Sequence, residues 1–78
     1  MSIATVTRFQ AEADRPLFAE LSVVEITRVV ETDDGAIVPA GSRGTIVAIY
    51  GGGAAYEVEF ARPVIGNCTL DREALRPV

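Results

Sequence analysis

The sequence lacks the residue types on which most enzyme sites are built. Its 78 residues contain no histidine, and all seven basic residues are arginine, so lysine is absent too. Histidine is the usual general base and metal ligand, and lysine carries Schiff-base chemistry. Their absence removes imidazole triads, Schiff-base mechanisms and most transition-metal sites. We therefore expect a chain that is not an enzyme and that uses neither a metal nor a cofactor.

Cysteine and long apolar runs are equally scarce. Cys68 is the one cysteine, which excludes a disulfide scaffold and favours a reducing compartment. With no base partner nearby in the sequence, its thiol is interpreted as a small apolar group packed in a short strand. Residues 1–8 lack the basic start and apolar run of a signal peptide, and no run approaches the ~20 residues that span a membrane. These features predict a cytoplasmic protein without a membrane segment.

The charge balance is acidic and the chain is short. The formal net charge is −4 and the isoelectric point about 4.6, with the basic residues scattered rather than clustered. Nucleic-acid affinity comes from cations that neutralise phosphates, so this balance disfavours it. A chain of this length forms one domain with a small core, which favours stabilisation by self-association.

The chain is organised around a turn that leads into a hairpin. Pro39, Gly41 and Gly44 suit a sharp reversal, and residues 45–50 are β-branched and aromatic, as strands prefer. Three glycines then interrupt the strand before residues 54–60, where apolar and acidic side chains alternate with the period of a half-buried strand. Two such strands around a glycine-rich loop predict a β-hairpin.

Shorter elements surround this hairpin. Residues 1–15 form an N-terminal arm that can add to a sheet edge, and residues 10–22 carry helix signals, with Asp14 as N-cap and Pro16 in the first turn. Residues 23–31 alternate as a strand, and residues 32–35 have turn chemistry. A short strand at 68–70, a single helical turn at 71–74 and a last strand at 75–78 complete the chain.

Five short, regularly spaced strands with no long helix predict a mainly β fold, closed into a small barrel that removes exposed edges. The alternation of side chains also predicts which of them point inward. Ile46 and Tyr50 are expected on the outer face. The expected core consists of Val24, Ile26, Val47, Ile49, Val58, Phe60, Leu70 and Leu75.

Several motifs resemble a known family. Residues 38–47, Tyr50, the run 56–60 and the closing Leu75-Arg76-Pro77 resemble a family of small bacterial domains of unknown function with an SH3-like barrel. The Gly-x-x-Gly-Thr-Ile-Val run from Gly41 also resembles the KOW-type turn of ribosomal and transcription-factor barrels. The resemblance implies a five-stranded SH3-like barrel over residues 16–78, with the arm outside it, and brings no catalytic residue with it.

Six residues are candidates for a binding surface. Tyr50 and Tyr56 flank the hairpin loop, where aromatic side chains suit an interface, although either one could equally cap the core. Arg43 and Arg62 lie in predicted loops, where they could pair with carboxylates of a partner or serve solubility alone. The remaining two candidates are Asp33 and Asp34.

Other polar motifs have simpler interpretations. Asp33 and Asp34 precede a glycine as in a calcium loop, but the apolar residues 36–38 stand where further oxygen ligands are needed, so a solvated turn is favoured. Glu57 and Glu59 share a strand face that water can solvate. The glycines at 51–53 join two strands, so no helix N-terminus follows them to hold a phosphate.

The function predicted from these features is a non-catalytic protein-interaction module, for instance the small partner subunit of another bacterial protein. Its acidic surface would suit a basic partner. The alternative is a KOW-like nucleic-acid-binding barrel, which rests on the turn motif and is opposed by the charge. A role as an enzyme accessory subunit merges with the first hypothesis. We also expect a homo-oligomer, most simply a dimer.

Overall fold

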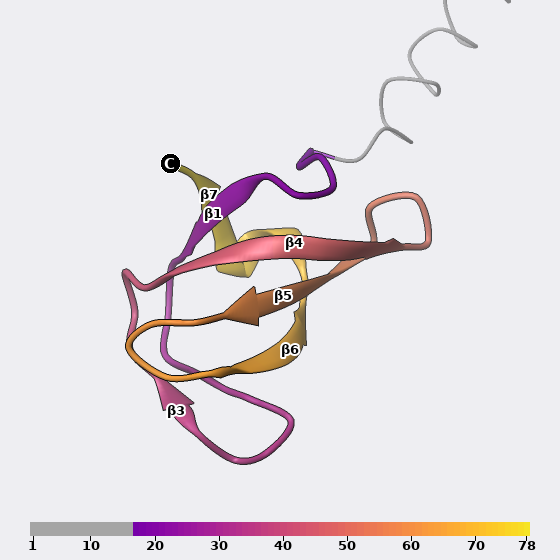
Figure 1. The fold of residues 1–78 in the computed structure, drawn as a ribbon. Coiled ribbons are helices and arrows are strands. Elements are labelled where there is room, and N and C mark those ends of the chain that lie inside the picture. Colours follow the sequence, from indigo (N-terminus) through magenta and orange to yellow (C-terminus); the bar gives the residue numbers. More distant parts are fainter. Residues whose placement is uncertain (1–16) are drawn as a thin grey trace, which may run out of the picture.

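A computed structural model describes residues 17–78 of the chain. These residues are mainly β, as predicted (Figure 1), and five of their strands form one antiparallel sheet. Its strand order is β6-β5-β4-β1-β7, and a separate two-stranded ladder pairs β2 with β3. The strands are β1 (Val23–Ile26), β2 (Val30–Glu31), β3 (Ile37–Val38), β4 (Arg43–Tyr50), β5 (Ala55–Phe60), β6 (Gly66–Leu70) and β7 (Leu75–Pro77).

The predicted central hairpin is confirmed. β4 and β5 pair from Thr45 opposite Glu59 to Tyr50 opposite Ala55, and Figure 1 shows their loop projecting at one end of the sheet. All three glycines of that loop have positive φ, between 59° and 117°, a region that costs other residues steric strain. The glycine run is therefore what closes this turn.

A β-bulge in β4 overturns part of the predicted core. Ile46 pairs with Val58 but Ala48 pairs with Glu57, so Val47 is an extra residue without a partner. The bulge reverses the alternation of side chains along the strand. Ile46 is consequently fully buried, whereas Val47, which the alternation placed inside, is only half-buried. Ile49 returns to the inner face and packs against the core.

The remaining predicted core residues are buried. Val24, Ile26, Val58, Phe60, Leu70 and Leu75 all belong to the core cluster. Six residues outside the predicted core set complete it: Val30, Val38, Ile46, Tyr56, Cys68 and Ala74.

The predicted strand 23–31 is split in two. β1 ends at Ile26, and the next residue bonds to the turn before β7. The Thr27 N–H donates to the Ala74 carbonyl, and the Thr27 hydroxyl donates to the Glu73 carbonyl. After a bend, β2 leaves the main sheet and pairs with β3 around the predicted turn at 32–35. This turn lies against β6, because the Asp33 N–H donates to the Asn67 carbonyl at 2.8 Å.

The predicted helix at 10–22 is not formed in the part that the structure describes; residues 1–16, with the arm and the helix start, lie outside that part. Residues 17–22 contain bends and a turn. Their backbone bonds go to the sheet instead of to a helical ladder: the Leu21 N–H donates to the Ile46 carbonyl, and the Ile46 N–H to the Ser22 carbonyl. Leu21 has a positive φ of 65° at this junction.

The predicted single turn before the last strand is present as a 3-10 helix, η1 (Arg72–Ala74), capped by the Asp71 carboxylate. The predicted closed barrel is not formed by strand pairing. β6 and β7 remain the two edges of the described sheet, because the residues between them bond within the turn rather than across a ladder.

Candidate functional site

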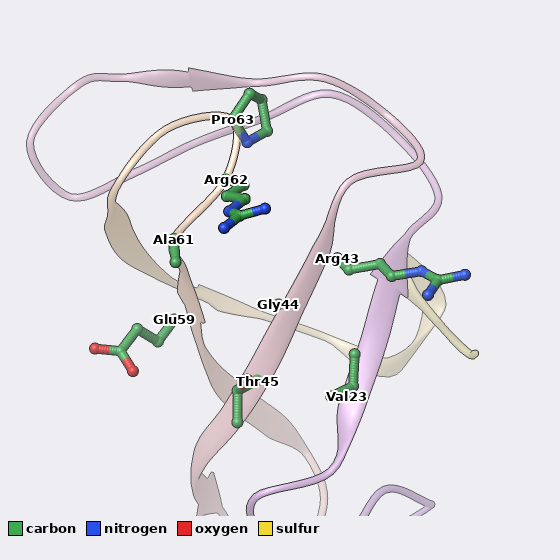
Figure 2. Close-up of a pocket in the computed structure, with 8 residues that line it drawn as sticks. All are labelled: Val23, Arg43, Gly44, Thr45, Glu59, Ala61, Arg62 and Pro63. Carbon is green, nitrogen blue, oxygen red and sulfur yellow. The ribbon is translucent and has the colours of Figure 1, made fainter.

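One groove among the described residues lies on the outer face of the sheet, over β1, β4 and the end of β5 (Figure 2). Its volume is about 810 Å³. The residues that line it come from three strands and from the loop after β5: Val23, Arg43, Gly44, Thr45, Glu59, Ala61, Arg62 and Pro63.

Strand register builds the floor of this groove. Val23 is opposite Thr45, and Thr45 is opposite Glu59, so the three residues form a row across the outer face. Gly44 precedes Thr45 on β4 and is close to the core, because a Cβ at this position would lie 2.6 Å from Val58 Cγ1. Gly44 therefore contributes only its backbone to the groove.

Two arginines on the groove have no ion-pair partner in the described part of the chain. Arg76 pairs with Glu25 at 2.7 Å, and Arg28 and Arg72 approach Asp71 and Glu73 at 4.0 Å. No carboxylate of residues 17–78 lies within 4.0 Å of Arg43 or Arg62. The two unpaired guanidinium groups of this region therefore both belong to one concave surface.

The side-chain directions keep these two charges apart from the one acidic group of the groove. Figure 2 shows Arg62 entering over the groove from the loop after β5, while Arg43 extends across β1. The carboxylate of Glu59 points away from both arginines. The predicted loop position of Arg43 is wrong, since this residue is the first of β4. The strand backbone therefore fixes the position of its Cα.

The predicted tyrosines do not join this groove. Tyr56 is fully buried in the core, its hydroxyl accepts a hydrogen bond from the Leu17 N–H at 2.9 Å, and its ring meets Phe18 edge-on at 5.4 Å. It therefore caps the core and is not accessible to a partner. Tyr50 is 47% exposed, but it stands at the hairpin end of β4, at the opposite end of the strand from Arg43.

The two aspartates also lie elsewhere. Asp33 and Asp34 are exposed in the turn between β2 and β3. Within residues 17–78 no group of three or more acidic, histidine or cysteine side chains is placed to hold a metal ion. The six predicted residues thus occupy separate places, of which only Arg43 and Arg62 share a concave surface.

Cys68 lies in the core on β6, opposite Val58. Burial, followed by the negative charges of Asp33 and Glu57, raises the pKa of the thiol, and Arg28 opposes this only in part. A thiol with a raised pKa is mainly protonated at neutral pH and is a poor nucleophile. The arrangement fits the interpretation of Cys68 as a packing residue.

Sequence reasoning missed the apolar and small residues of the groove. Val23 was a usable signal, because the strand alternation places it on the outer face, where an apolar side chain needs an explanation; it is 50% exposed. Ala61 and Pro63 gave no such signal, since small residues and proline are ordinary in loops. Only the fold brings them beside β4.

Comparison with family models, with curated proteins and with solved structures gave no match to this chain. Among residues 17–78 there is also no helix with the length and apolar character needed to cross a membrane.

Proposed function

We propose that this chain is a non-catalytic protein-interaction module whose contact surface is the groove over β1, β4 and β5. The observation that carries the proposal is the pair of arginines, Arg43 and Arg62, which have no carboxylate partner among residues 17–78 and line the same concavity. Arginine suits interfaces because its planar guanidinium group binds carboxylates with two parallel hydrogen bonds and stacks on planar groups. Half-exposed Val23 adds apolar area beside them.

We further propose that the sheet is an SH3-like fold. In support, the edge strands β6 and β7 are consecutive in the chain, and only residues 71–74 join them. Four strand spacings of about 4.8 Å would separate these edges by about 19 Å in a flat sheet. The five steps from Leu70 to Leu75 reach at most about 18 Å when fully extended, and the 3-10 turn shortens them. The sheet must therefore curl strongly, as a small barrel does.

The proposal is tested by affinity capture from a bacterial lysate treated with nuclease. The wild-type chain is compared with Ala61→Trp, which places a large side chain at an exposed position of the groove. Ala54→Trp is the matched control, because Ala54 is equally exposed but lies in the hairpin loop at the far end of β4. A specific protein that is retained by the wild type and by the control, and is lost with Ala61→Trp, supports the module. Equal capture by all three chains, or capture of no protein, contradicts it.

The second candidate, a KOW-like nucleic-acid-binding barrel, is favoured by the same two arginines, since guanidinium groups also bind phosphates. The net charge of −4 opposes it. Captured material that disappears on nuclease treatment would support this candidate over the first. For either function we propose a cytoplasmic location, in line with the single cysteine.

A further inference from the structure

We propose that the groove binds an extended acidic peptide segment with two carboxylates about three residues apart, one for Arg62 and one for Arg43. This inference rests on the proposed interaction function and names the chemistry of the partner. It differs from the simplest expectation for an acidic chain, which is a basic partner. The local charge of the groove, not the net charge of the molecule, decides which ligand fits there.

Charge complementarity is the first argument. Among the five arginines at positions 17–78, three have a carboxylate within 4.0 Å and two do not. Glu25, the cross-strand neighbour of Arg43, is already bound at 2.7 Å by Arg76. Glu59 is directed away from the guanidinium groups (Figure 2). A ligand carboxylate would therefore meet these two arginines without displacing an ion pair formed among residues 17–78.

The spacing follows from the register of the sheet. Arg62 follows β5, and Arg43 on β4 extends across β1, so the two guanidinium groups lie on either side of β4 (Figure 2). Two strand spacings amount to about 10 Å. A peptide in the extended polyproline II conformation advances about 3.1 Å per residue and has about three residues per turn, so acidic side chains three residues apart lie on one face and match this span.

The floor of the groove explains why an extended backbone fits between these charges. Gly44 contributes no side chain on either face, and Thr45 and Ala61 are small. Val23 and Pro63 provide the apolar area, which favours apolar side chains between the two acidic residues. A duplex nucleic acid also presents anions, but it has no apolar side chains to place there, and the acidic remainder of this chain repels it.

The test begins with selection of random short peptides on the immobilised full-length chain. We expect enrichment of sequences with two Asp or Glu residues about three positions apart, and loss of that enrichment with the Arg43→Gln/Arg62→Gln double variant. The affinity of one selected peptide is then measured by fluorescence anisotropy. We expect about tenfold weaker binding for each arginine removed, and a similar loss when the peptide's Glu residues become Gln.

Arg72→Gln is the matched control, because it removes the same charge from an exposed arginine outside the groove. Thermal unfolding of each variant checks that the fold is retained. Enrichment without acidic residues, unchanged affinity in the groove variants, or tighter binding of a single-stranded oligonucleotide would overturn the inference. If selected peptides lack acidic residues but are still lost with Ala61→Trp, the interaction function stands and only the acidic partner is wrong.

Discussion

At the scale of single residues, Gly44 lines the groove with its backbone, while the position of its missing Cβ faces the core. A Cβ here would lie 2.6 Å from Val58 Cγ1 and 3.0 Å from both the Glu59 carbonyl oxygen and Phe60 Cε1. Two of these three contacts are core side chains and one is backbone, so β4 or these neighbours have to shift. We expect Gly44→Ala to lower the free energy of unfolding by about 1–3 kcal/mol, measured by urea denaturation.

A double-mutant cycle identifies the cause of this loss. Val58→Ala removes the methyl groups that the new Cβ would meet, so Gly44→Ala should cost less in that background than in the wild type. An equal cost in both backgrounds would mean that the contact with Val58 is not the source of the destabilisation.

Cys68 gives a prediction about pH. Burial and the neighbouring carboxylates raise the pKa of its thiol in the folded chain. Above the unfolded value of about 8.5, the unfolded chain releases this proton more readily than the folded chain. The folded state then holds more protons, so the stability from this group is complete below that pH and falls as pH rises.

We therefore expect the wild type to lose stability faster than Cys68→Ala above about pH 8.5, measured as the free energy of unfolding in urea. The comparison cancels the titration of the groups that both chains share. Parallel pH profiles for the two chains would show that the thiol has the same pKa folded and unfolded.

At the scale of elements, the bulge in β4 decides which side of the strand faces the core. Ile46 is fully buried and Val47 is the unpaired residue beside it. We expect Ile46→Ala to cost about 2–5 kcal/mol, because it leaves a cavity, and Val47→Ala to cost much less. Both are measured by urea denaturation. A larger loss for Val47→Ala would support the unbroken alternation and contradict the bulge.

The same strand shows where sequence reasoning ends. The turn at 32–35, the hairpin around the three glycines and the capped turn at Asp71 were predictable, because local chemistry determines each of them. The bulge was not, since residues 46–49 are a continuous apolar run with no glycine or polar residue to mark it. The split after Ile26 was also missed, because it depends on carbonyls of residues 73 and 74, far away in the sequence.

At the scale of the whole molecule, the candidate site depends on distant segments. Arg43 and Arg62 were both candidates for a binding surface from the sequence. Only the pairing of β4 with β5 brings the loop that contains Arg62 to the same groove as Arg43. Tyr56 was a surface candidate because it flanks a loop, with capping of the core as the open alternative. Its alternation with Val58 and Phe60 favoured the inner face, where it lies. The register of the strand was a better guide to its burial than its distance from the loop.

Self-association is the last prediction, and it belongs to the whole molecule. The core cluster of the described residues is small, while the segment leading into β1 exposes Leu17 and Leu21, with Leu21 75% exposed. A second copy could cover this apolar strip, whose exposure to water is unfavourable. The two edge strands are less suited to pairing with a strand of a second copy. The 32–35 turn already bonds to β6 at Asn67, and Pro77 in β7 has no N–H to donate.

We therefore expect the full-length chain to be a dimer in size-exclusion chromatography with light scattering. A version without residues 1–12 tests whether the N-terminal arm takes part, and should be monomeric if it does. Leu21→Asp separates the two contributions, because it changes the exposed strip and leaves the arm intact. A dimer that survives truncation but not Leu21→Asp would place the interface on the strip alone. Two identical monomeric masses, for the full chain and the truncated one, would show that the small core is stable without a second copy.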